Sequence, residues 1–310
     1  MALTSRICLH GSEPWGPEDY LSTSLGVIYP NDVTNQHGDA EHSLIYTSPN
    51  LPRPLALELA VTESEAERRL FSHHLWNSSL LLAELVERDT LGVEDADRDG
   101  DFGLGEGASF HVGGQAVLEL GAGTALPSIM AGILGARRVV VTDYPAPPIL
   151  SSLRSNVEHN IRPSFAPAGS SATPAASILV QGHSWGELSD AFCLSNRHAF
   201  DRIFVADCLW MPWEHANLLR SIEHFISVDN EDARCWLVAG FHTGREKIRG
   251  FFEEKTLREV GLELERIWER DCDGQERVWM SHRPEDDITV RKRWLLVAVL
   301  RRTTVNACTS

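Results

Sequence analysis

Two short segments carry residues whose types and spacing suit the binding of an adenosine-containing cofactor. Residues 117–127 begin as an apolar run and break into Gly121-Ala122-Gly123, where backbone N–H groups can approach a ligand without a Cβ in the way. Asp143 ends a second apolar run about twenty residues after this turn, where its carboxylate can accept both hydroxyls of a ribose. The alternative interpretation is a glycine turn and an acid that bind no ligand. This interpretation is the weaker one, because the turn and the acid occur together in register.

The same turn indicates which kind of adenosine cofactor fits. A dinucleotide site needs G-x-G-x-x-G, whereas Leu126 stands at the third glycine position and Pro127 follows it. A pyrophosphate is therefore disfavoured, and the sequence contains no G-x-x-x-x-G-K-[ST] loop for a nucleoside triphosphate. An uncrowded turn combined with a ribose acid points to S-adenosylmethionine (SAM).

Charge and composition narrow the class of partner. The chain has 310 residues and a formal net charge of −16, which repels nucleic-acid phosphates and attracts a basic protein segment or a cationic small molecule. Acidity that only promotes solubility is the alternative interpretation. No apolar run has the length of a membrane span, and the first residues do not resemble a secretory signal. We therefore expect a cytoplasmic protein, with a nuclear fraction also compatible, and no nucleic-acid or membrane partner.

Two patterns that resemble metal or redox sites lack the residues that such sites need. The six cysteines include no C-x-x-C pair, so we expect no metal site and reduced, mostly buried thiols. They are Cys8, Cys193, Cys208, Cys235, Cys272 and Cys308. Asp95-x-Asp97-x-Asp99-Gly100-x5-Glu106 satisfies the calcium-loop pattern. The glycines that follow make the required exiting helix implausible, so we expect an acidic, solvated insertion at about residues 92–114.

Alternating strand and helix patterns predict the elements that position the turn and the acid. Residues 1–54 form a loop-rich N-terminal arm, residues 55–302 the cofactor-binding domain, and residues 303–310 a tail. Residues 55–61 read as a strand, Thr62 and Glu65 as a capping box for a helix, and residues 75–86 as a helix with Trp76 at its entrance. The expected sheet is doubly wound and mostly parallel, with an antiparallel edge and no helix between its last two strands; its seven strands lie near residues 117–120, 139–143, 178–180, 200–206, 235–239, 262–268 and 294–300.

Five motifs in this order resemble one group of the class I, seven-β-strand SAM-dependent methyltransferases. The group is that of the fungal nicotinamide N-methyltransferase-like proteins, which includes lysine methyltransferases acting on translation elongation factor. The similarity extends from about Leu55 to Leu300 and rests on His74-Leu75-Trp76-Asn77, Leu118-Glu119-Leu120-Gly121-Ala122-Gly123-Thr124, Val141-Thr142-Asp143-Tyr144-Pro145, Gly182-His183-Ser184-Trp185-Gly186 and Ala206-Asp207-Cys208-Leu209-Trp210.

The resemblance implies a role for individual residues. Gly121 and Gly123 would cradle the methionine part of SAM, Asp143 would hold the ribose, Trp185 would lie along the adenine, and Trp76 would close the site from the N-terminal side. Core packing is the alternative for both tryptophans. The complete set of implied cofactor contacts is Trp76, Glu119, Gly121, Gly123, Asp143, Trp185 and Ala206.

Two positions depart from the family pattern. Ala125 stands where the family usually has glycine, and its methyl group could tighten the turn and weaken SAM binding. Asp207-Cys208-Leu209-Trp210 replaces an acid-x-x-Tyr/Phe signature, so Trp210 keeps an aromatic face for a cation but fills more of the acceptor pocket. The implied catalytic residues are Asp207, which would orient an incoming ammonium before its proton is lost to water, and Trp210, which would desolvate it. Alternatively, Asp207 only caps the loop.

Together these features predict a SAM-dependent N-methyltransferase that modifies a protein lysine or N-terminal amine. A small-molecule acceptor, nicotinamide-like or a secondary metabolite, is one alternative. A non-catalytic SAM-binding regulatory partner is the other, which Ala125 and the altered acceptor motif make plausible.

Overall fold

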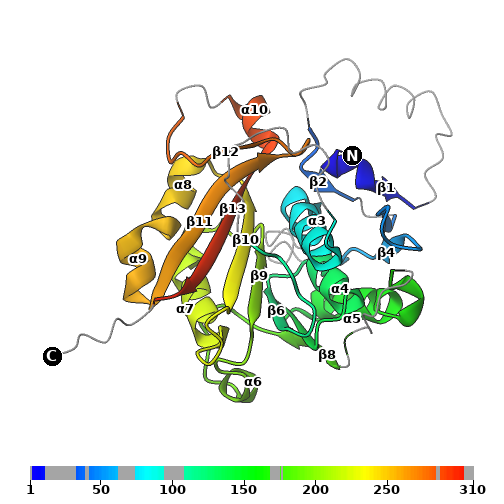
Figure 1. Ribbon diagram of the computed structural model, residues 1–310, viewed down its shortest axis with the longest axis horizontal. Coiled ribbons are helices and arrows are strands. Elements are labelled where there is room, and N and C mark those ends of the chain that lie inside the picture. Colours follow the sequence, from blue (N-terminus) through cyan, green and yellow to red (C-terminus); the bar gives the residue numbers. More distant parts are fainter. Residues whose placement is uncertain are drawn as a thin grey trace.

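A mostly parallel sheet forms the centre of the protein in a computed structural model (Figure 1), which describes residues 2–10, 33–38, 42–61, 74–93, 108–167, 175, 177–283 and 287–303. Its eight described strands lie in the order β12-β11-β13-β10-β9-β6-β7-β8. Their bounds are β6 Ala116–Leu120, β7 Arg138–Asp143, β8 Ser177–Gly182, β9 Arg202–Ala206, β10 Arg234–Gly240, β11 Leu262–Asp271, β12 Glu276–Val278 and β13 Trp294–Arg302.

The five strands from β8 to β10 are parallel, which brings their carboxyl ends to one edge of the sheet. Leu120 of β6 pairs with Thr142 of β7 and Val205 of β9, and Ala206 of β9 pairs with Val238 of β10. The chain leaves these strands at Gly121, Asp143 and Asp207, so the predicted site residues lie along the same edge, as expected for an open α/β sheet.

The predicted α/β class and the seven predicted strands are confirmed, with differences at the end of the sheet. β13 lies between β10 and β11 and is antiparallel to both, while the short β12 forms the edge beside β11. The expectation of no helix before the last strand is wrong, because α10 (Ile288–Lys292) precedes β13. β12 has three residues and α10 has five, so both are too short to produce a periodic sequence signal.

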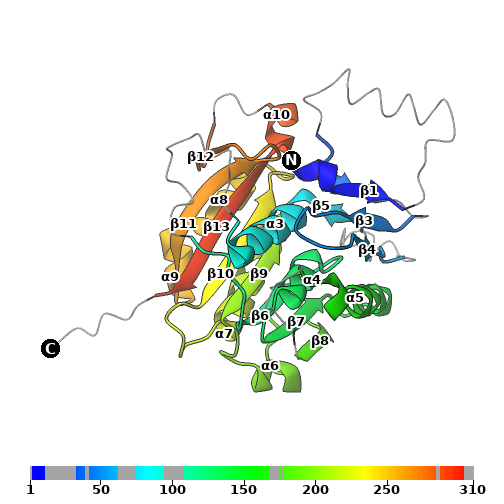
Figure 2. The ribbon, with the colours of Figure 1, turned by 45° about the vertical axis from the view of Figure 1, so that its right-hand side comes forward.

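Helices cover both faces of the sheet, and each face has its own apolar core. One core joins strand residues such as Val117 and Val139 to α3 (Asn77–Leu91), α4 (Leu126–Ile133) and α5 (Pro147–Asn160). The other joins Leu118 and Val140 to α6 (Ala191–Ser195), α7 (His215–Phe225), α8 (Arg245–Arg249) and α9 (Glu254–Glu259), and Figure 2 shows α3 and α4 lying across the sheet from α7. Successive strand residues point to opposite faces, which explains the division.

The N-terminal arm contains more regular structure than the sequence indicates. A 3-10 helix, Leu3–Arg6, leads into β1 (Ile7–Leu9), which pairs with β3 (Leu44–Tyr46); β3 pairs with β4 (Leu55–Leu57). β2 (Gln36–His37) pairs with β5 (Leu75–Trp76), directly before α3. Arg6 is buried and forms ion pairs with Glu84 at 3.1 Å and Glu87 at 3.3 Å, which fix the arm on α3.

Two asparagines of α5 connect the arm to the predicted cofactor turn. Asn160 exchanges hydrogen bonds with the backbone of Ala56 on β4, and Asn156 does the same with Glu58. Asn156 also donates to the carbonyl of Thr124 at 3.2 Å, so one side chain braces both segments.

Some predictions fall outside the described residues. They are the capping-box helix that begins at Thr62, most of the acidic insertion with its calcium-like pattern from Asp95 to Glu106, and Cys308. Of the other five cysteines, all are free thiols, and Cys8 alone is exposed. No helix in the described part of the chain combines the length and apolar character needed to cross a membrane.

Candidate active site

The glycine turn after β6 is closed by two side chains from distant parts of the sequence. Gly121 has φ of 71° and Gly123 of 56°, conformations in which a Cβ is strained. A Cβ added at Gly121 would lie 2.8 Å from Sγ of Cys208 and 3.0 Å from Cζ2 of Trp185. The predicted adenine residue Trp185 therefore lies directly beside the predicted methionine cradle.

The loop after β8 holds Trp185 in this position. Gly186 adopts φ of 80° and donates its N–H to Oγ of Ser221 on α7 at 2.9 Å. His183 approaches the same hydroxyl at 3.1 Å. Because both sides of Trp185 are fixed to α7, its half-buried ring is held against the turn.

Asp143 lies at the carboxyl end of β7 and binds the turn through the backbone. One carboxylate oxygen accepts the N–H of Gly123 at 2.8 Å, and the other accepts the N–H of Tyr144 at 2.7 Å. Burial raises the pKa of Asp143 to about 6, although both hydrogen bonds oppose this shift. A carboxylate has about four acceptor positions, so two remain for ribose hydroxyls.

Glu119 is a fully buried acid beneath the turn. It accepts the N–H of Ser128, in the first turn of α4, at 3.1 Å, and burial raises its pKa to about 8. Its other oxygen and the hydroxyl of Thr124 have no hydrogen-bond partner among the described residues. These polar atoms and the cradle at Gly121 are compatible with a polar cofactor at this turn, so the residues present fit SAM.

Ala125 is the N-cap residue of α4 and has φ of 63°, in the left-handed region that favours glycine. Its side chain is fully buried and belongs to the core on the α3 face of the sheet. The departure from the family pattern therefore places a strained backbone next to the predicted cofactor turn, while the methyl group itself packs inside the protein.

Asp207 follows β9 and collects three hydrogen bonds. Its Oδ1 accepts Oγ–H of Ser78 at 3.1 Å and the N–H of Gly240 at 2.9 Å, while Oδ2 lies 2.8 Å from Nε2 of His242. The side chain is buried and its φ is 60°. Non-glycine residues in this region are costly and cluster at functional sites.

His242 completes the group at the end of β10. Burial lowers its pKa, but the neighbouring Asp207 carboxylate more than offsets this effect, so the pKa is raised overall. Its ring lies 4.7 Å from the ring of Trp76, and Nδ1 lies 3.4 Å from the amide nitrogen of Asn35. Sequence reasoning missed His242, although its place just after a parallel strand was a usable signal.

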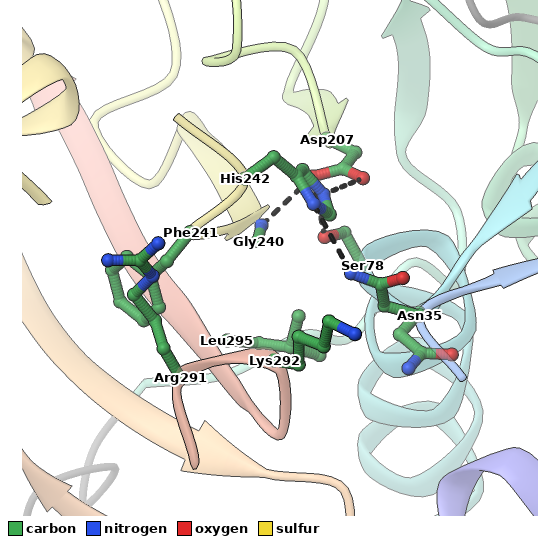
Figure 3. Close-up of a pocket in the computed structure, with 10 residues that line it drawn as sticks. Asn35, Ser78, Asp207, Gly240, Phe241, His242, Arg291, Lys292 and Leu295 are labelled. Atoms are coloured by element: carbon green, nitrogen blue, oxygen red, sulfur yellow. Dashed lines mark hydrogen bonds and ion pairs between the residues drawn. The ribbon is translucent and has the colours of Figure 1, made fainter. Parts of the chain in front are cut away.

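A pocket of about 160 Å³ opens beside Asp207 and His242. Figure 3 shows these two side chains on one side of the pocket, with Lys292 and Leu295 on another. The residues that line the pocket come from the arm, α3, the ends of β9 and β10, α10 and β13: Asn35, Asn77, Ser78, Asp207, Gly240, Phe241, His242, Arg291, Lys292 and Leu295.

The loop after β9 links the pocket to the glycine turn. Asp207 lines the pocket, and the next residue, Cys208, donates its thiol to the carbonyl of Leu120 at 3.3 Å. Ala206, the last residue of β9, precedes both. Trp76, predicted to close the cofactor site, lies against His242 beside the pocket.

Trp210 lies at the outer end of this loop. Its ring is half-buried and meets Trp213 edge-on at 6.3 Å, and Trp213 is 70% exposed. No group of three or more metal-ligating side chains occurs in the ranges that the structure describes.

The comparison with known proteins decides the family. A sequence profile described as lysine methyltransferase matches residues 56–256, more than half of the chain. The chain belongs to the lysine methyltransferase family. This confirms the predicted methyltransferase class and, with it, SAM as the methyl donor.

Individual relatives agree with this assignment. The chain is 31% identical over 233 residues to a protein N-terminal and lysine N-methyltransferase EFM7 from Gibberella zeae, covering 71% of this chain and 75% of that protein. A Kluyveromyces lactis protein of the same name is 27% identical over 261 residues, covering 81% and 80%.

A solved structure supports the fold alone. A Streptococcus mutans protein described as a SAM-dependent methyltransferase aligns with a TM-score of 0.51 over 91% of this chain and 65% of that chain, at 11% identity.

Proposed function

We propose that this protein transfers the methyl group of SAM to amines of another protein, with an N-terminal α-amine and a lysine ε-amine as its acceptors. The names of the EFM7 relatives support both kinds of acceptor. Their sequence similarity and the family profile favour a protein acceptor over the small-molecule and regulatory alternatives. The cytoplasmic location expected from the sequence stays a prediction.

One observation carries the proposal most directly: two consecutive residues connect the two halves of the site. Cys208 adjoins the glycine turn, and Asp207 before it lines the pocket. An acceptor amine in the pocket would therefore lie beside the same loop that borders the cofactor turn. We assign cofactor binding to the turn and acceptor binding to the pocket.

SAM supplies an activated methyl group on a sulfonium, so the protein mainly needs to align the acceptor and exclude water. Gly121, Gly123 and Asp143 would hold the cofactor, with Trp185 along its adenine. Glu119 would support the turn from below. Trp76 would close the cofactor site from the N-terminal side, and Trp210 would provide an aromatic wall that desolvates the acceptor ammonium.

The acceptor must present a neutral nitrogen. At pH 7 only about one lysine in two thousand is neutral, whereas about one N-terminal amine in ten is neutral, because its pKa lies near 8. The site therefore faces a much smaller deprotonation problem with an α-amine than with a lysine. The net charge of the whole chain, −16, favours the approach of either cation.

Radiolabelled SAM separates the alternatives. The protein is incubated with dialysed cell lysate or with a metabolite extract, and label is counted in the protein and small-molecule fractions. We expect label in protein. Gly121→Ala serves as the control variant, because its added Cβ would collide with Cys208 and Trp185 and should abolish the signal. Label found only among the metabolites would show that the acceptor is a small molecule and not a protein.

A further inference from the structure

The ammonium of an acceptor needs a group that takes its proton, and Asp207 is poorly arranged for this task. Its two oxygens already accept hydrogen bonds from Ser78, Gly240 and His242. An aspartate in such a setting holds its neighbours in place more readily than it binds a new proton, because hydrogen bonds to the charged form stabilise that form.

His242 has a second ring nitrogen, Nδ1, that does not contact Asp207. A carboxylate only accepts hydrogen bonds, so Nε2 of His242 must carry the proton that points at Asp207. In the neutral ring Nδ1 then bears a lone pair. Its described neighbour is the amide nitrogen of Asn35, whose distance of 3.4 Å makes a weak contact that an acceptor amine can replace.

The groups around His242 suit reversible protonation. Asp207, from the loop after β9, stabilises the imidazolium, and Arg291 of α10 opposes it. Lys292 of α10 lines the same pocket, whereas α3 contributes the uncharged Ser78. On the arm, His37 is bonded to Asn77 of α3.

We propose that His242 takes the proton from the acceptor ammonium and that Asp207 is the positioning residue that fixes its ring. This inference rests on the proposed function. The ammonium N–H proton moves to Nδ1, leaving a neutral amine and an imidazolium. The amine lone pair then forms the new N–C bond while the S–C electron pair returns to sulfur, giving S-adenosylhomocysteine and a methylated ammonium. The imidazolium afterwards releases its proton to water.

The pH profile of His242→Gln tests this role. The glutamine amide can still donate to Asp207 but cannot accept a proton at neutral pH. Rates of label transfer from saturating radiolabelled SAM to lysate proteins are measured between about pH 6.5 and 10, with the rate in the absence of enzyme subtracted. His111→Gln, on an exposed loop before β6, is the matched control.

At pH 7 we expect His242→Gln to be slower by about 100-fold, a usual contribution of general-base catalysis. The ratio of the wild-type rate to the variant rate should fall as pH rises, because the solvent then takes the proton from the amine. For an α-amine the ratio should approach one between about pH 9 and 10, whereas for a lysine, which is still mostly protonated there, it should only have begun to fall. SAM affinity, measured by calorimetry, should stay unchanged. His111→Gln should follow the wild type throughout.

A constant ratio across the whole pH range would overturn the inference, since a structural defect is not repaired by deprotonating the acceptor. Equal rates at pH 7 would overturn it as well. If His242→Gln does not fold, His242→Asn is tested in the same way, and the same two outcomes decide. A wild-type protein that labels nothing at any pH would instead contradict the proposed function itself.

Discussion

Asp207 holds Nε2 of His242 at 2.8 Å, and this contact joins the end of β9 to the end of β10 in the lining of the pocket. The same carboxylate accepts the backbone N–H of Gly240, so the two strand ends are fastened at two points. Asp207 therefore has a structural role and a place in the proposed acceptor pocket at the same time, and substitutions must separate the two roles.

Asp207→Asn makes that separation. The amide oxygen can still accept from Gly240 and Ser78, but the NH2 group cannot accept the His242 N–H. We expect methyl transfer to fall by about 100-fold, roughly 3 kcal/mol in the barrier, while SAM affinity measured by calorimetry barely changes. Asp207→Ala should in addition lower the free energy of unfolding by about 1–3 kcal/mol, because buried donors lose their acceptor. Full activity in Asp207→Asn would show that methyl transfer does not require the Asp207 carboxylate.

Asp143→Ala should weaken SAM binding by about 1.5–3 kcal/mol, the usual size for a hydrogen bond to a charged group. Calorimetry gives the affinity directly. Since Asp143 also binds the N–H groups of Gly123 and Tyr144, thermal unfolding must show that the variant is folded. Undiminished affinity in a folded variant would be incompatible with the ribose role.

Glu119 should make stability depend on pH. Burial raises its pKa from 4.5 to about 8, so the native state retains a proton that the unfolded state releases across this window. The free energy of unfolding should therefore fall as pH rises from 4.5 to 8. Glu119→Gln removes this effect and can still accept from Ser128, so its stability relative to wild type should be greater at pH 8.5 than at pH 4.5.

Urea unfolding of both proteins at the two pH values measures this difference. It should amount to a few kcal/mol at most, since one pKa unit corresponds to about 1.4 kcal/mol. Asp143 contributes a change of the same sign between pH 3.8 and about 6, but it does so in both proteins and cancels. An equal stability difference at both pH values would show that Glu119 is ionised in the folded protein at neutral pH.

Ala125→Gly should alter neither stability nor SAM affinity by much. Relief of the left-handed strain contributes about 1–2 kcal/mol. Loss of a buried methyl group, about 0.8 kcal/mol, and the greater freedom of glycine in the unfolded chain offset it. Ala125→Val should be clearly destabilised, because a β-branched residue fits this backbone poorly. A large gain in SAM affinity for the glycine variant, measured by calorimetry, would mean that the natural methyl group weakens the cofactor site.

The geometry of the proposed cofactor turn was predictable from the sequence because its signals are local. A strand, a glycine turn and an acid at the end of the next strand follow one another within about thirty residues, and the structure places Gly123 and Asp143 in direct contact. Regular apolar runs likewise located the seven main strands.

The acceptor half was less predictable because it is assembled from distant segments. His242 and Ser78 meet only through Asp207, and a lone histidine or serine has no sequence pattern that reveals such a contact. The two-residue pairing of β2 with β5 joins segments about forty residues apart, and no sequence pattern indicates it. α10, which contributes Arg291 and Lys292 to the lining of the pocket, is too short for its periodicity to be recognised.

The most direct test of the account is the position of the methyl group on the acceptor. Proteins labelled by the wild-type enzyme in lysate are digested and sequenced by mass spectrometry, with Gly121→Ala as the negative control. We predict added methyl groups on an N-terminal α-amine, a lysine ε-amine or both, and none with the control. Methylation confined to carboxylates, arginines or thiols would contradict the account, as would SAM binding without any methylated protein.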